Sequence, residues 1–151
     1  MSLFDELTTG LFAAEIAPFI LSGNDSAISE LLNGKNISVN DSVSVNTFAL
    51  WCASTGMRAT IQDHAGNTAS PLRSIALTLL DLLQGNLQPA SLDLSVSGNV
   101  VMLDAWIAAG ALTQSQKDEL ILLSQKTVSR AEQLGIDCSI PAIAFALRGQ
   151  L

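Results

Sequence analysis

The sequence predicts a mainly α-helical fold, and three observations support this. Apolar residues recur at helical spacing along most of the chain, as in residues 3–21 and 71–83. Glycines and capping residues divide these stretches into short segments. The alternation typical of strands is confined to residues 36–45 and 92–96. We expect one compact domain over residues 1–151, with six or seven short helices around a buried central helix at 71–83 and a minor β element.

The N-terminal stretch predicts two helices. A wide apolar stripe favours an amphipathic helix over residues 3–21, weakened in the middle by Gly10. Pro18 is expected to kink or restart that helix. A second short helix is expected over 24–32, with an Asn or Asp cap at its start and Asn33-Gly34 at its end.

Residues 36–45 change to a period of two. Their valines and Ile37 alternate with polar residues, and Asn40-Asp41 lies between the two halves. This pattern predicts a small hairpin with a tight turn, packed on helices. The alternative is that one strand pairs with the second alternating run at 92–96.

The middle of the chain predicts the core. Two short helices are expected over 44–54 and 57–64. The pair Ser70-Pro71, a cap followed by proline, predicts the start of the next helix. That helix, at 71–83, is apolar on nearly all sides, so we expect it to be buried by its neighbours.

The C-terminal third predicts further helices. Apolar residues favour a helix over 100–109, with Ser97 as a possible cap. Thr113 with Gln116 forms a capping box for the next helix, giving a tight αα-hairpin. Helices are also expected at 126–134 and 141–148.

The chain is poor in charge. Only 14% of its residues are charged, against about 25% in an ordinary soluble domain. Acids outnumber bases 14 to 7, and the formal net charge is -7. Binding to nucleic acid or to an anionic membrane requires clustered Lys and Arg, so we expect neither partner. Neutral surface patches favour protein partners, and the alternative is a monomer with a Ser/Thr-rich surface.

Few residues suit catalysis. His64, the one histidine, lies beside Asp63 in a predicted turn, and Cys52 lies in an apolar run typical of a buried thiol. The sequence has neither the ligand spacing of a zinc or calcium site nor a glycine-rich phosphate loop. We therefore expect a non-enzymatic protein without cofactor, metal or small-molecule substrate. An enzyme with an unfamiliar carboxylate site is the remaining catalytic alternative.

Two carboxylates lie within apolar helical stretches. A buried carboxylate must find donors or become protonated. We therefore expect Asp81 or Asp104 to pair with Arg58, Arg73 or Arg130 in or beside the core, in a structural role.

Large aromatic residues are the candidate contacts with a partner, since such residues dominate binding energy at interfaces. The alternative is that each belongs to the core. They are Phe4, Phe12, Phe19, Trp51 and Trp106.

Two segments of the C-terminal third are distinctive: Leu-Asp-Ala-Trp-Ile-Ala-Ala-Gly-Ala-Leu-Thr at 103–113 and Ser-Arg-Ala-Glu-Gln-Leu-Gly at 129–135. They resemble a loose family of small proteins encoded by tailed bacteriophages. The resemblance implies a phage context and carries no catalytic residues.

Together with the scarcity of charge, the resemblance predicts a virion subunit that docks on a tail, neck or capsid assembly. Its partners would be other phage structural proteins or further copies of itself. The alternative is an accessory protein that inhibits a host defence or enzyme in the cytoplasm of the infected bacterium. The acidic N-terminus and the lack of a long apolar run predict neither a secretory signal nor a spanning helix.

Overall fold

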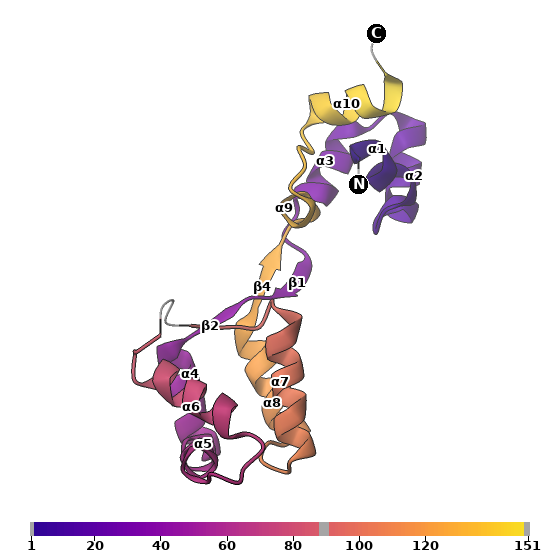
Figure 1. The fold of residues 1–151 in the computed structure, drawn as a ribbon. Helices are drawn as coiled ribbons and strands as arrows, with labels where there is room; N and C mark the ends of the chain where they lie inside the picture. Colours follow the sequence, from indigo (N-terminus) through magenta and orange to yellow (C-terminus); the bar gives the residue numbers. More distant parts are fainter. Residues whose placement is uncertain (1, 88–90, 150–151) are drawn as a thin grey trace. The chain divides into compact units, whose positions relative to one another are not determined.

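Helices make up most of the chain, as the sequence predicts (Figure 1). The computed structural model describes residues 2–87 and 91–149. Within them the helices are α1 (Leu3–Thr9), α2 (Ala13–Ser22), α3 (Asp25–Asn33), α4 (Val45–Thr55), α5 (Met57–Gly66), α6 (Arg73–Leu83), α7 (Ser97–Ala108), α8 (Gln114–Ser124), α9 (Arg130–Leu134) and α10 (Ile140–Arg148). The strands are β1 (Ile37–Asn40), β2 (Ser42–Ser44), β3 (Ser91–Asp93) and β4 (Gln125–Val128).

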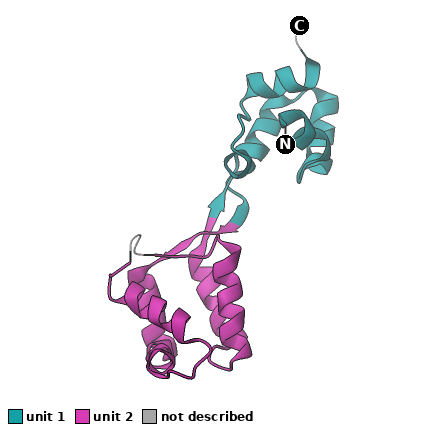
Figure 2. Cartoon of the chain, in the orientation of Figure 1, with its two compact units in different colours: residues 1–38, 127–151 teal, residues 39–126 magenta. Residues whose placement is uncertain are grey.

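The chain divides into two compact units, drawn in different colours in Figure 2. Unit 1 combines both ends of the chain, residues 1–38 and 127–151, and unit 2 is the continuous stretch 39–126. Each unit has its own hydrophobic cluster. The expected single helical domain over 1–151 stays a prediction, because a domain is defined by cooperative folding as well as by contacts.

The first predicted helix is broken at Gly10 and not at Pro18. Gly10 adopts an extended conformation, and its amide donates to the carbonyl of Glu6 at 3.0 Å, which closes α1. Glycine is a poor helix former, so the chain turns there at low cost. Pro18 lies inside α2, and the helix continues through it to Ser22. This split contributes to a count of ten helices in the described residues, more than the six or seven expected.

The predicted hairpin at 36–45 is wrong, and the alternative pairing is found. β2 pairs with β3 in antiparallel register, with Val43 opposite Leu92, and β1 pairs with β4. The backbone of Asp41 forms hydrogen bonds with two distant segments. Its amide donates to the carbonyl of Ser124, and its carbonyl accepts from the amide of Leu94. The two halves of 36–45 therefore join different ladders.

Residues 125–128 form β4, where the sequence predicts a helix. The helix starts afresh after Ser129, whose side chain accepts from the amide of Glu132 while the Glu132 side chain accepts from the amide of Ser129. This capping box fixes the start of α9, so the helical pattern covers only the last part of the predicted segment.

The helix predicted at the core, observed as α6, belongs to the cluster of unit 2. Its inner face buries Ala76, Leu79 and Leu82. Its outer face is exposed and carries Leu77 and Asp81. The αα-hairpin of α7 and α8 forms as predicted, with Thr113 and Gln116 in a reciprocal capping box.

Candidate functional site

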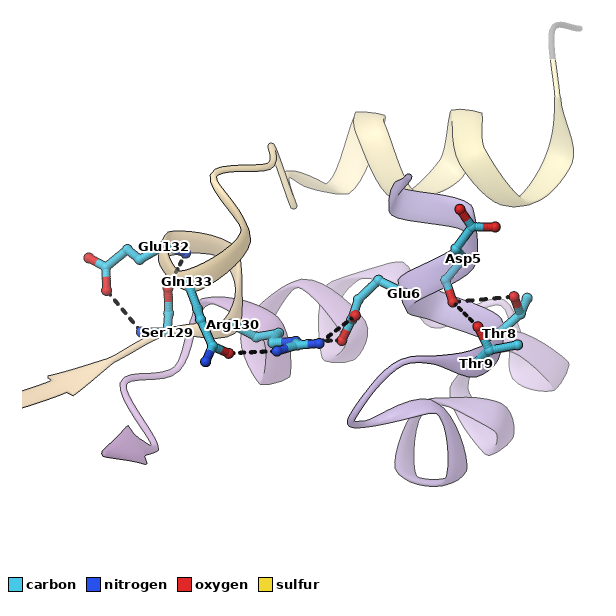
Figure 3. Close-up of polar contacts among 8 residues, drawn as sticks. All are labelled: Asp5, Glu6, Thr8, Thr9, Ser129, Arg130, Glu132 and Gln133. Carbon is cyan, nitrogen blue, oxygen red and sulfur yellow. Dashed lines mark hydrogen bonds and ion pairs between the residues drawn. The ribbon is translucent and has the colours of Figure 1, made fainter. Parts of the chain in front are cut away.

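Glu6, a buried carboxylate, forms an ion pair with Arg130 within unit 1 (Figure 3). The Nε and Nη2 atoms of Arg130 donate to the two carboxylate oxygens of Glu6, at 2.7 and 2.9 Å. Nη1 donates to the side-chain oxygen of Gln133 at 2.6 Å. The Glu6 side chain is 0% exposed and the Arg130 side chain 13% exposed. The geometry is bidentate, which is the strongest arrangement for such a pair.

Local sequence positions both partners. The capping box of Ser129 and Glu132 places Arg130 in the first turn of α9. On the other side, Gly10 leaves room for the carboxylate of Glu6. A Cβ at that position would lie 2.3 Å from Cδ and from Oε2 of Glu6.

The charges of Glu6 and Arg130 are satisfied by neighbouring groups within unit 1. Hydrogen bonding to Glu6 raises the pKa of Arg130 above its usual value, so the guanidinium stays charged. Every guanidinium nitrogen is engaged by a protein group. The pair therefore fixes α1 against α9 within unit 1.

The predicted partners of the arginines are not found. Arg130 pairs with Glu6, and Asp104 pairs with Lys117, at 2.5 Å between Oδ1 and Nζ. Asp81 is exposed, so its carboxylate stays hydrated. Within residues 2–87 and 91–149, neither Arg58 nor Arg73 forms an ion pair.

Sequence reasoning missed Glu6 because acids are common in the first turn of a helix. The spacing of Glu6 and Gly10 was the available signal, since residues four apart share a helix face. A glycine there can leave room for a side chain that turns inward.

The histidine has a partner that the sequence did not indicate. His64 Nδ1 lies 2.7 Å from the hydroxyl oxygen of Ser70, which also accepts from the amide of Leu72. The imidazole packs edge-on against the ring of Trp106. These contacts tie the end of α5 to the start of α6, which is a structural role.

The thiol of Cys52 is unreactive at neutral pH. Burial raises its pKa to about 12, so at neutral pH it stays protonated and is a poor nucleophile. In the part of the chain that the structure describes, no three His, Cys, Asp or Glu side chains are grouped to hold a metal ion.

The candidate aromatic contacts fall into three classes. Trp51 and Trp106 are core residues of unit 2, only 4% and 1% exposed, so they are not surface anchors. Phe12 and Phe19 are partly buried against the cluster of unit 1. Only Phe4 is largely exposed.

The structure instead reveals an apolar groove in unit 2 that sequence reasoning missed. It lies between α4 and α8, has a volume of about 430 Å³, and is lined by Thr47, Leu50, Trp51, Ser54, Glu119 and Leu123. Leu50 is 73% exposed and Leu123 is 47% exposed. We call this feature the α4–α8 groove.

Comparisons with known proteins do not assign the chain. No protein-family model, curated protein or solved structure matches it. Among the described helices, none combines the length and the apolar character that crossing a membrane requires. Inference about function therefore depends on the side chains themselves.

Proposed function

We propose that the protein is a non-enzymatic virion subunit of a tailed bacteriophage that docks on a tail, neck or capsid assembly through protein–protein contacts. The α4–α8 groove is the observation that carries the proposal. Large aliphatic side chains line a hollow on the surface of a chain in which only 14% of residues are charged. Interface cores are depleted in charge in the same way.

The roles of the reactive side chains support a binding protein over an enzyme. His64 holds the start of α6 through Ser70, and the carboxylate of Glu6 is engaged by Arg130. Cys52 is buried, with a raised pKa. The first two groups therefore hold structural contacts, and the thiol is a poor nucleophile.

The phage context has a separate basis. It derives from the resemblance of residues 103–113 and 129–135 to small tailed-phage proteins. These segments cover the hairpin between α7 and α8 and the capped helix α9.

Quantitative mass spectrometry of purified virions, from a phage that encodes this chain, tests the proposal. We expect the protein at a fixed ratio to the major capsid protein in successive preparations. Absence from virions, together with abundance in the lysate of infected cells, would overturn the proposal and favour an inhibitor of a host protein.

A further inference from the structure

The α4–α8 groove is built from two helix faces. Thr47, Leu50, Trp51 and Ser54 recur at i, i+3, i+4 and i+7, so they share one face of α4. Glu119 and Leu123, four residues apart, share one face of α8. Trp51 is buried and forms the floor, and Leu50 and Leu123 form exposed apolar walls.

The walls indicate an apolar occupant. Covering Leu50 and Leu123 removes aliphatic surface from water, which is favourable in proportion to the area covered. A groove between two packed helices suits a third helix, whose apolar side chains at i, i+3 or i+4, and i+7 enter it together.

The charge at the groove indicates a basic occupant. Glu119 is exposed and forms no ion pair within residues 2–87 and 91–149. The two lysines of unit 2 are engaged elsewhere, Lys117 with Asp104 and Lys126 with Asp41. Arg58 and Arg73, the arginines of unit 2, form no ion pair within the described residues, but neither lines the groove. A Lys or Arg of a partner would therefore supply the cation opposite Glu119, and complementary charge of this kind gives specificity and speeds association.

A second copy of this chain fits the groove poorly. In a two-fold symmetric dimer the same patch meets itself, so Glu119 of one copy would approach Glu119 of the other. The chain also carries 14 acids against 7 bases, so two copies repel each other overall.

We infer that the α4–α8 groove binds a basic amphipathic α-helix of a different protein, with leucine-like anchors between Leu50 and Leu123 and a Lys or Arg opposite Glu119. This inference rests on the proposed function, because it names the kind of partner that the docking subunit takes.

Two synthetic peptides of about 18 residues test the inference, since shorter helices are marginal in water. Both carry leucines at i, i+3 and i+7; one has lysines on its polar face and the other has glutamates. Binding to the full-length protein is followed by fluorescence anisotropy of the labelled peptide. We expect the lysine peptide to bind at least about 10-fold more tightly than the glutamate peptide. Its affinity should fall as the salt concentration rises.

Matched variants locate the site. Leu50→Ser and Leu123→Ser are each expected to lower the affinity for the lysine peptide about 10-fold. Val101→Ser, at a side chain that is 63% exposed on α7, is the control and leaves binding unchanged. Glu119→Lys is expected to reverse the preference between the peptides, whereas Asp81→Lys, with the same change in charge on α6, is not.

Several outcomes would overturn the inference. These are binding of neither peptide, equal binding of both, or equal losses in the control and groove variants. A dimer in light scattering that Leu50→Ser dissociates would assign the groove to a second copy. If the peptides fail but virions contain the protein, the inference fails and the proposed function stands.

Discussion

At the scale of single residues, Glu6 and Arg130 show how a charge can be buried in this chain. Removing a carboxylate from water is costly, and the cost is offset only when donors satisfy both oxygens. Arg130 does so with two hydrogen bonds. The pair also joins residues that are 124 positions apart in the sequence. Breaking this pair is therefore a sensitive test of the packing of unit 1.

Arg130→Ala is expected to lower the free energy of unfolding of unit 1 by about 3 kcal/mol, because it leaves the carboxylate of Glu6 buried without its partner. Urea unfolding followed by circular dichroism measures the change. Lys35→Ala is the control: its ion pair with Glu132 is open to solvent, 65% and 50% exposed, so its removal should leave the free energy of unfolding nearly unchanged. Equal losses in the two variants would show that the burial of Glu6 has no energetic consequence.

Gly10→Ala is expected to destabilise the protein by about 2 kcal/mol or more, because the new methyl group would overlap the carboxylate that Arg130 holds in place. Gly66→Ala is the matched substitution. Gly66 lies at the end of α5, and apart from its chain neighbours and its own helix backbone no atom lies within 4 Å of the place that the new methyl group would take, so alanine should be neutral or stabilising by up to about 1 kcal/mol. Thermal unfolding of both variants measures the contrast, and a harmless Gly10→Ala would contradict the packing described for Glu6.

The raised pKa of Cys52 predicts a loss of stability in alkali. Below about pH 9 the thiol is protonated in both the folded and the unfolded protein. Between pH 9 and about 12 only the unfolded chain loses the proton, so the free energy of unfolding falls as pH rises. The loss attributable to this group approaches about 1.4 kcal/mol per pH unit.

Urea titrations at several pH values, on the wild type and on Cys52→Ala, isolate that contribution. The difference between the two proteins should shrink as pH rises above 9. A difference that is constant up to pH 11 would mean that the thiol ionises equally easily in the folded state.

At the scale of elements, local signals predicted helices better than pairings. Thr113 with Gln116 identified the start of α8 correctly, because a capping box satisfies amides within a few residues. The strand partners were harder to predict: the pattern at 36–45 fits either a hairpin or two separate ladders. The choice depends on contacts of Asp41 with Ser124 and Leu94, which lie more than fifty residues away. For the same reason, the sequence did not reveal the groove between α4 and α8.

Thr113→Ala tests the cap at the start of α8. The threonine hydroxyl accepts from the amide of Gln116 at 3.2 Å, and its loss is expected to cost about 1 kcal/mol. Thr113→Ser keeps the hydroxyl and should retain most of the stability. Chemical denaturation distinguishes the two variants, and equal losses would attribute the effect to the lost methyl group instead of the cap.

At the scale of the whole molecule, the chain has two separate hydrophobic clusters. The cluster of unit 2 contains both tryptophans, and the cluster of unit 1 is built from the two ends of the chain. Composition and periodicity predicted the helical class, but they did not show that the apolar residues divide into two groups. That division depends on which helices pack together, and similar apolar stripes do not specify their partners.

The two clusters allow a direct test of cooperativity. Because Trp51 and Trp106 both lie in unit 2, tryptophan fluorescence reports on that unit, whereas far-ultraviolet circular dichroism reports on helices of both. Separate clusters predict that Arg130→Ala moves part of the dichroism transition to lower urea and leaves the fluorescence midpoint unchanged. If the two signals coincide in the wild type and shift together in the variant, the units unfold as one cooperative domain, as the sequence predicts for residues 1–151. The contrast is decisive because the substitution and the probe lie in different units.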